Sequence, residues 1–220
     1  MDRLNYSSEQ LIDAVAACGY HALAITGHQH LTFRKSAADY ARERGVLLVP
    51  GVELLVEGKH LLVLNPDEQQ ASARTFAELR SLGRRDAAII APHPFYPMPQ
   101  SLGAKLTENI DLFDAVEYSS FYRRRINFNR RAASVAARHG LPLLGSSDNH
   151  MWPHLDTTFS WIDVEEVSVA GIVTAIRAGC VTLDTRPLPM KYGIRLTAFQ
   201  LMLCCRYMMG KGAGPERQGD

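Results

Sequence analysis

The stretch LAITGHQHL, residues 23–31, joins a short apolar run to a polar end that holds two histidines. A short apolar run that stops at Thr and Gly is typical of a buried β-strand. Such a strand would bring His28 to the point where the chain meets solvent, while His30 would lie in the following loop. A single histidine in this position is more often a loop or core residue than a metal ligand. The residues that end the other strands therefore decide between these interpretations.

The segments on either side of this stretch alternate between helical and strand patterns. Ser7 precedes Gln10 by three positions and the helical pattern stops at Gly19, which are typical signals of a helix start and a helix end. The expected helices cover residues 7–18, 36–44, 73–82, 127–139 and 167–178. The expected strands lie within residues 22–26, 46–54, 60–64, 87–95, 112–120, 141–150, 159–165 and 180–183. Apolar strands that alternate with amphipathic helices favour parallel βαβ units and hence one α/β domain.

We expect this domain to cover residues 1–186. Residues 187–220 would form a C-terminal helical appendage, in which the apolar stretch 196–209 packs on the core or a partner, and residues 210–220 would be disordered. The stretch 196–209 is too short to cross a bilayer. The N-terminal sequence MDRLNYSSEQ also lacks the apolar segment that a signal peptide needs. No membrane partner is therefore expected.

The composition is that of an ordinary globular protein, with 46% hydrophobic and 21% charged residues among 220. A formal net charge of +1 provides no general field for nucleic acid or for a membrane surface. The four cysteines form no CxxC pair, which argues against a disulfide framework and against a cysteine-ligated zinc. Such cysteine usage favours a reducing cytoplasm.

Five apolar runs end in a histidine or an acidic residue. Their ends carry His28, Glu53, His93, Glu117 and the pair Asp148 and His150. In a parallel α/β barrel the carboxyl ends of all strands lie on one face, so these side chains would converge there. Imidazole and carboxylate ligands together suit zinc, manganese or iron, and several of them around one cavity can hold more than one ion. The coincidence of five strand ends favours a metal site over unrelated loop histidines and helix caps.

His60 begins the run HLLVL and would lie near Glu53 if residues 46–54 and 60–64 form a hairpin. The remaining histidines do not end a strand, and we expect them in loops or in the core: His21, His30, His139 and His154.

The motifs AITGHQ, PGVEL, KHLLVL, APHPF and GSSDNH occur in an order and spacing that resemble the polymerase and histidinol phosphatase (PHP) superfamily. The resemblance extends over nearly the whole chain to about residue 183. It implies a distorted (β/α)7 barrel that hydrolyses phosphate esters with a metal-activated water. It also implies a cluster of up to three divalent ions, such as Zn, Mn or Fe, at the carboxyl ends of the strands.

The resemblance assigns metal ligands residue by residue. His28 and His150 would hold one ion, with Asp148 serving the same ion beside Glu53. Glu53 and Asp148 are thereby implied in catalysis.

A second ion would involve three of the same strand-end residues. Glu53 would bridge the ions, with His60 and His93 on the second one. Glu117 matches a position whose role varies more in the family and ranks below these ligands.

Two departures from the family pattern carry expectations of their own. The family usually opens with a strand that ends in His-x-His, whereas this chain begins at the turn and helix that follow it. We therefore expect the barrel to lack its first strand, with a neighbouring strand edge exposed and activity impaired. The family also usually has Asp between the Thr and the His of its second motif, where this chain has Gly27.

The loop FYRRRINFNRR follows the strand that ends at Glu117 and holds Arg123, Arg124 and Arg125. An arginine fork matches the oxygens of a phosphate group, so these residues are candidates for substrate binding. A solvated basic start of a helix explains them about equally well. The expected partner is a small phosphate ester or a nucleotide, without a stable nucleic-acid partner. The oligomeric state is open.

Two other functions stay open. A degenerate PHP module could bind metal or a partner without turnover, which the absent first strand would explain. An amidohydrolase acting on C–N bonds is the weaker alternative, because such enzymes usually also open with His-x-His and use a lysine at the end of a middle strand, and neither occurs here.

Overall fold

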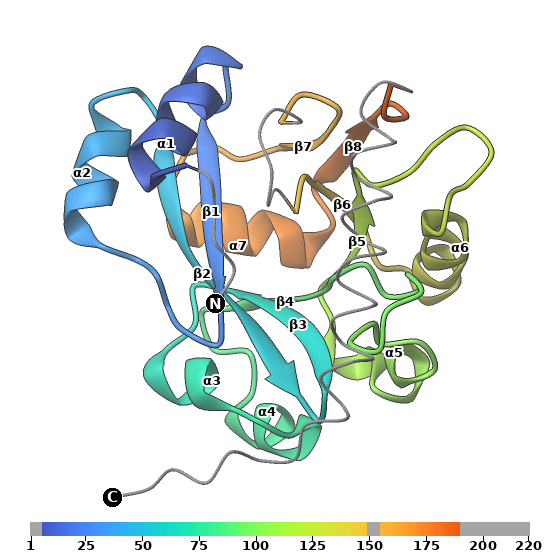
Figure 1. Cartoon of the computed structure of the whole chain (residues 1–220). Helices are drawn as coiled ribbons and strands as arrows, with labels where there is room; N and C mark the ends of the chain where they lie inside the picture. Colours follow the sequence, from blue (N-terminus) through green and yellow to red (C-terminus); the bar gives the residue numbers. More distant parts are fainter. Residues whose placement is uncertain (1–5, 149–154, 190–220) are drawn as a thin grey trace, which may run out of the picture.

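The computed structural model describes residues 6–148 and 155–189. Its strands form a curled six-stranded sheet and a separate two-stranded sheet (Figure 1). The large sheet has the order β1 (Ala22–His28), β2 (Leu47–Val56), β3 (Lys59–Leu64), β4 (Ala88–Ala91), β5 (Ala115–Ser119), β6 (Leu143–Ser146). The small sheet pairs β7 (Thr158–Ile162) with β8 (Val181–Thr185). The strand pattern of the sequence is thus confirmed in a mixed α/β fold.

The large sheet is not parallel throughout. The pairs β1–β2, β4–β5 and β5–β6 are parallel, whereas β3 runs antiparallel to both of its neighbours. A two-residue turn causes this reversal, because Glu57 and Gly58 have φ of 48° and 76° and join the paired residues Val56 and Lys59. Positive φ at both central positions gives the turn the twist that a tight hairpin needs. The expectation of parallel βαβ units is therefore wrong at β3, where the hairpin turn overrides it.

The described residues contain eight helical segments, one before β1 and the others between strands. They are α1 (Ser8–Ala17), α2 (Lys35–Arg42), α3 (Glu68–Ser72), α4 (Phe76–Leu82), α5 (Lys105–Glu108), η1 (Ile110–Leu112), α6 (Asn129–His139) and α7 (Val169–Ala178). The Ser7 side chain accepts from the Gln10 backbone N–H and the Gln10 side chain from that of Ser7, so the capping box is present. The helix expected over residues 73–82 starts only at Phe76, because Thr75 forms a second capping box with Glu78.

Helices cover both faces of the large sheet. On one face, α4 and α6 bury apolar side chains such as Leu79 and Val135 against Val52, Leu54 and other residues of the strands. On the other face, α7 (orange in Figure 1) contributes Ile172, Val173 and Ile176 to a second apolar cluster. A third cluster lies where α1 and α2 pack on β1 and β2. Burial on both faces explains the almost continuous apolar runs of the strands.

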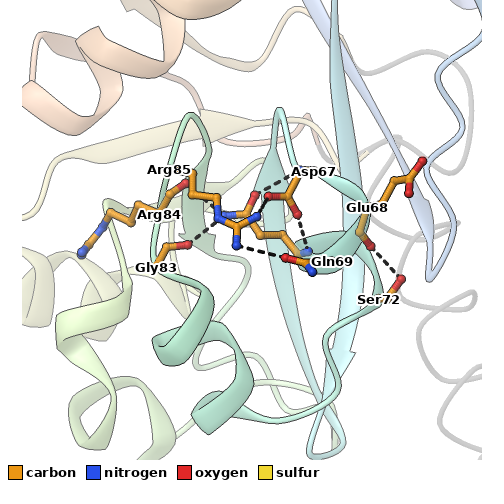
Figure 2. Close-up of polar contacts among 8 residues, drawn as sticks. Asp67, Glu68, Gln69, Ser72, Gly83, Arg84 and Arg85 are labelled. Atoms are coloured by element: carbon orange, nitrogen blue, oxygen red, sulfur yellow. Dashed lines mark hydrogen bonds and ion pairs between the residues drawn. The ribbon is translucent and has the colours of Figure 1, made fainter.

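The connection between β3 and β4 is held by a polar network around α3 (Figure 2). Asp67 caps α3 by accepting the Gln70 backbone N–H at 2.8 Å and also pairs with the Arg85 guanidinium. Arg85 donates in addition to the Gln69 side chain at 3.0 Å. The buried Gln70 amide donates to the carbonyl oxygens of Gly83 and Arg84. These bonds fix the segment that carries the chain to β4.

Two expectations about the fold stay predictions. The described strands form an open curled sheet beside the two-stranded β7–β8 sheet, so a complete (β/α)7 barrel stays a prediction. Most of residues 187–220, and with them the expected helical appendage, lie outside the described residues. Within the described residues, no helix combines the length and the apolar character that crossing a membrane requires.

Candidate metal centre

One face of the large sheet changes from apolar to polar along each strand. On β2, Val49 packs in the cluster under α7, and Glu53 points to the same face four residues later. On β5, Ala115 packs in that cluster and Glu117 follows on the same face. On β1, Ala24 packs against the same apolar cluster, and His28 follows on the same face of the strand. The strand period of two therefore brings these polar side chains to one face beyond the apolar cluster.

Glu53 lies at the centre of three histidines. Its Oε2 atom is 2.9 Å from His28 Nε2, and its Oε1 atom is 3.0 Å from His60 Nδ1 and 3.5 Å from His93 Nε2. Glu53 and His93 are buried, with 7% and 3% of their surfaces exposed, while His28 is exposed. Four strands or strand ends thus meet at one carboxylate.

The register of the sheet explains how the histidines reach Glu53. His28 is paired with Glu53 across the parallel β1–β2 ladder, and His60 is paired with Leu55 across the β2–β3 hairpin. Because β3 runs antiparallel, its first residues lie at the carboxyl end of β2. The conditional prediction that a hairpin would bring His60 near Glu53 is confirmed. His93 follows β4 directly, in the adjacent position of the sheet.

The charges in this cluster shift the pKa values of its members. Burial favours the neutral form of Glu53, but the imidazole nitrogens of His28, His60 and His93 beside the carboxylate outweigh burial and lower the pKa of the carboxyl. Burial likewise opposes the charged form of His93, yet its bond to Glu53 and the charges of Glu117 and Asp148 raise the pKa of this imidazole to about 9. The metal-free cluster therefore favours a carboxylate that faces a protonated His93.

The donor set fits a divalent metal ion. Ligand atoms of Glu53, His60 and His93 all lie within 4.8 Å of one another. His60 Nδ1 is buried and, despite its distance of 3.0 Å from Glu53 Oε1, makes no well-formed hydrogen bond to a described residue. A buried nitrogen left in this way is costly unless a ligand engages it. Two imidazoles and one carboxylate are a ligand set typical of zinc, manganese or iron sites.

Glu117 accepts a hydrogen bond from the His93 backbone and does not belong to the ligand group of Glu53, His60 and His93. Only 1% of its surface is exposed, and its carboxyl oxygens accept the His93 backbone N–H and the Ser146 hydroxyl. Burial is the main reason why the pKa of Glu117 is raised, and the charge of Asp148 adds to it. Ser101 completes the support, because its hydroxyl donates to the His93 carbonyl oxygen at 3.0 Å.

His93 requires this support because of its backbone. Its φ of 28° lies in the left-handed region, where a residue with a side chain is strained. The sequence predicts Glu117 at a strand end, but Glu117 lies in the middle of β5 (Ala115–Ser119). Nothing in the sequence indicates that its partner is a backbone N–H. Ser101 and Ser146 had no signal either, since their partners lie 8 and 29 residues away.

Asp148 follows β6 and has φ of 42°, a second strained position beside the cluster. Its negative charge adds to the causes that raise the pKa values of His93 and Glu117. His150, the other ligand expected after β6, lies outside the described residues, as does His154.

The remaining histidines and Gly27 lie outside the ligand group. His21, His30 and His139 are exposed, and none belongs to it. A Cβ atom at Gly27 would collide with the Thr32 methyl group. The Thr32 side chain therefore occupies the space that an acidic side chain at position 27 would need.

The arginine loop connects to the metal centre through aromatic rings. The His93 and Tyr96 rings are 6.4 Å apart, and the Tyr96 and Phe128 rings are 5.3 Å apart. The loop itself turns through a bond from the Arg123 backbone N–H to the Ile126 carbonyl oxygen at 2.8 Å. Arg124 and Arg125 are exposed. Their role in substrate binding stays a prediction.

Comparison with known proteins extends these observations. A family model described as PHP-associated matches residues 127–181, which include α6, β6, β7 and α7. No curated protein matches the chain in sequence.

Three solved structures share the fold. A two-domain protein from Bacteroides vulgatus that contains a predicted PHP-like metal-dependent phosphoesterase matches with a TM-score of 0.58 and 16% identity, over 81% of this chain and 60% of that one. PsfC from Pseudomonas syringae matches with a TM-score of 0.62 and 15% identity, over 89% and 87% of the two chains. A candidate metal-dependent phosphoesterase from Bifidobacterium adolescentis matches with a TM-score of 0.51 and 16% identity, over 70% and 86%.

At these identities the solved structures show a common fold and nothing more specific. This chain spans 60% of the length of the two-domain protein. The matched family model covers the segment that follows β5, including Asp148 and the helix packed on the sheet. The chain is thus similar to PHP-associated proteins over residues 127–181 and shares its fold with the three solved structures.

Proposed function

We propose that the protein is a metal-dependent phosphoesterase that hydrolyses a small phosphate ester or nucleotide. The observation that carries the proposal is the convergence of His28, His60 and His93 on one buried carboxylate, Glu53. A group of this kind at the carboxyl ends of strands is where an α/β fold holds its reactive residues.

The chain's own residues divide between holding metal and holding its ligands in place. Glu53, His60 and His93 would hold one divalent ion, Zn, Mn or Fe. His28, Asp148 and His150 would hold a second or third ion beside it. When bound, such ions acidify water and offset the negative charge of a phosphoryl group. Glu53 and Asp148 are the carboxylates closest to this chemistry, and Glu117 keeps His93 oriented through its backbone N–H.

The substrate would enter past the loop that carries Arg123, Arg124 and Arg125. Arg124 and Arg125 are exposed, and the loop continues into Phe128, which contacts Tyr96 beside His93. Arg124→Ala is expected to raise KM for a phosphate ester by about tenfold, the effect of one lost charged contact, while metal binding stays unchanged. Steady-state kinetics and metal analysis of the same preparation test this. An unchanged KM would remove Arg124 from the substrate site.

A second function, metal binding without turnover, is favoured by two observations. Within the described residues β1 lies at the edge of the large sheet, paired only with β2. Position 27 has no room for an acidic side chain unless Thr32 moves. We propose that the sheet is part of a (β/α)7-type barrel whether or not the protein catalyses hydrolysis. An amidohydrolase is disfavoured, because Lys59 at the start of β3 binds the carbonyl oxygens of Pro99 and Ser101 instead of the cluster.

Metal analysis combined with a hydrolysis assay tests the proposal. The purified chain is depleted of metal, reloaded with Mn²⁺ or Zn²⁺, and assayed with p-nitrophenyl phosphate. Glu53→Gln should lose both bound metal and hydrolysis, whereas Glu165→Gln, at an exposed position outside the cluster, should lose neither. Bound metal without hydrolysis of any phosphate ester would favour the non-catalytic module. Failure of the unaltered chain to bind either ion would overturn both functions.

A further inference from the structure

A groove on the outer side of the molecule lies between α5 and α6 and has no part in the metal centre. Its volume is about 370 Å³, within the range of small-ligand pockets. It is lined by Phe95, Gly103, Ala104, Thr107, Arg131, Ser134, Val135 and Arg138. No lining residue is acidic, and none belongs to the metal-ligand group.

The charged residues that line the groove are all positive. Arg131 and Arg138 are seven positions apart on α6, with Ser134 between them, so all three lie on one face of the helix. Among the described residues neither arginine has a carboxylate partner. Other arginines of this chain, such as Arg80 and Arg84, are paired with Asp111 and Asp114. Two guanidinium groups are therefore available to an anion in the same groove.

The lining also contains apolar surface for the organic part of a ligand. The Arg131 guanidinium lies over the Phe95 ring, 4.3 Å from its centroid, which fixes the direction of that side chain. Val135 is buried beneath the groove. The Ser134 side chain is exposed and supplies a hydroxyl group between the two arginines. Two arginine forks, one hydroxyl and an aromatic ring are the groups that recognise an organic phosphate.

The groove and the metal centre share one segment of backbone. His93 reaches the metal centre, and two residues later Phe95 lines the groove. A ligand against Phe95 and Arg131 would therefore contact the segment that carries a metal ligand, without entering the metal centre.

We propose that this groove is a second anion site, which binds the phosphate group of a small organic phosphate through Arg131 and Arg138. The site is independent of the proposed hydrolysis. It would bind phosphate whether or not metal is present, and its loss would leave metal binding at Glu53 intact.

Calorimetry with two probes tests the site. Inorganic phosphate and phenylphosphonate, which has no ester bond to hydrolyse, are titrated into the full chain with its metal and again after chelation. The groove predicts binding that survives chelation and is tighter for phenylphosphonate, because its ring can contact Phe95 and Val135. Equal affinity for both probes would indicate a site for free phosphate instead. Binding that disappears with the metal would assign the phosphate to the metal centre and overturn the proposal.

Three matched variants locate the binding on α6. Arg138→Gln and Arg131→Gln should each weaken metal-independent binding of phenylphosphonate about tenfold or more, the effect of one charged contact. Arg130→Gln removes an equally exposed charge of the same helix outside the groove and should change affinity little. Among the described residues Arg138 makes no ion pair and does not stack on an aromatic ring, so this variant should fold normally, which circular dichroism checks. Equal affinities of the Arg138 and Arg130 variants would overturn the proposal, whereas the metal content of each variant reports separately on the metal centre.

Discussion

His93 joins a strained backbone to a buried imidazole that faces a carboxylate. Its φ of 28° is unfavourable. Its Nε2 atom lies 3.5 Å from Glu53 Oε1, and only 3% of the surface of His93 is exposed. The surrounding negative charges raise the pKa of the imidazole to about 9 in the absence of metal. A metal ion needs the neutral imidazole, so a proton and a metal compete for this residue.

Metal affinity should therefore rise with pH. Since the pKa of His93 is about 9 in the metal-free site, binding at pH 7 displaces one proton, and affinity should rise by up to tenfold per pH unit until pH reaches about 9. Titration calorimetry in two buffers of different ionisation enthalpy measures the released proton. Metal binding without proton release at pH 7 would contradict the assignment of His93 as a ligand.

The stability of the metal-free protein should show the opposite trend. The folded-state pKa of His93 lies above its unfolded value of 6.5, so its contribution is complete below pH 6.5 and is lost as pH rises to about 9. The melting temperature of the chelated chain should fall over this window. His93→Gln should remove that fall, because glutamine does not titrate, and a slope that persists in the variant would assign it to another group.

Glu117 offers a test of whether backbone support matters to the metal centre. Glu117→Ala would leave the buried His93 N–H without an acceptor, which should lower the free energy of unfolding by about 1–3 kcal/mol and weaken metal binding. Glu117→Gln keeps an oxygen for His93 and an amide for the Ser146 hydroxyl, and should bind metal nearly as well as the unaltered chain. Chemical unfolding and metal titration measure the two effects. Equal loss of affinity in both variants would mean that the charge of Glu117, and not its hydrogen bonds, is required.

At the scale of elements, β6 lies close against the small β7–β8 sheet. A Cβ atom at Gly145 would lie 2.5 Å from the Phe159 carbonyl oxygen and 2.7 Å from Leu183 Cδ1. The Gly145 backbone N–H also donates to the Ser160 hydroxyl at 2.8 Å. This close approach attaches the small sheet to the strand that precedes Asp148.

Gly145→Ala should destabilise the fold by about 1–3 kcal/mol, because the added methyl group meets backbone that cannot easily move. Gly19→Ala is a comparison variant with no atom within 4 Å of the added carbon, where only the φ of 78° is unfavourable. Its effect should be about 1 kcal/mol. Urea unfolding measures both, and an effect at Gly145 no larger than at Gly19 would show that β6 and the small β7–β8 sheet can separate at little cost.

At the scale of the whole molecule, the metal centre joins segments that lie far apart in the sequence. Glu53, His60 and His93 come from β2, β3 and the segment after β4, and His28 from the edge strand β1. Because the unfolded chain cannot hold these groups together, an ion that binds them should stabilise the folded state selectively.

Metal should therefore raise the melting temperature. At a free metal concentration 100 times the dissociation constant, the expected stabilisation is about 2.7 kcal/mol. Differential scanning calorimetry with and without Mn²⁺ measures it. The shift should disappear in Glu53→Gln and persist in Glu165→Gln, whereas equal shifts in both variants would point to ions bound elsewhere.

Much of the secondary structure followed from short-range patterns. The capping box at Ser7 depends on a residue three positions away, and the apolar strand runs depend on adjacent and alternate residues. Residues at strand ends could be named as ligands for the same reason, since the end of a strand is a local property. The reversal at β3 was considered only as a condition for bringing His60 near Glu53, although Glu57 and Gly58 form a local turn.

The amino-acid sequence by itself determined which strands exist, that His28 ends one of them, and that the chemistry of His28, Glu53 and His93 suits a metal, although β2 continues past Glu53 to Val56. Only the tertiary structure decided that His60 joins them through a hairpin, that Glu117 holds a backbone N–H, and that Arg131 and Arg138 share a groove with Phe95. The physical reason is the distance along the sequence between the residues that interact. Helix and strand patterns depend on neighbouring residues, whereas these contacts depend on how distant segments pack, which fixes register and backbone strain together.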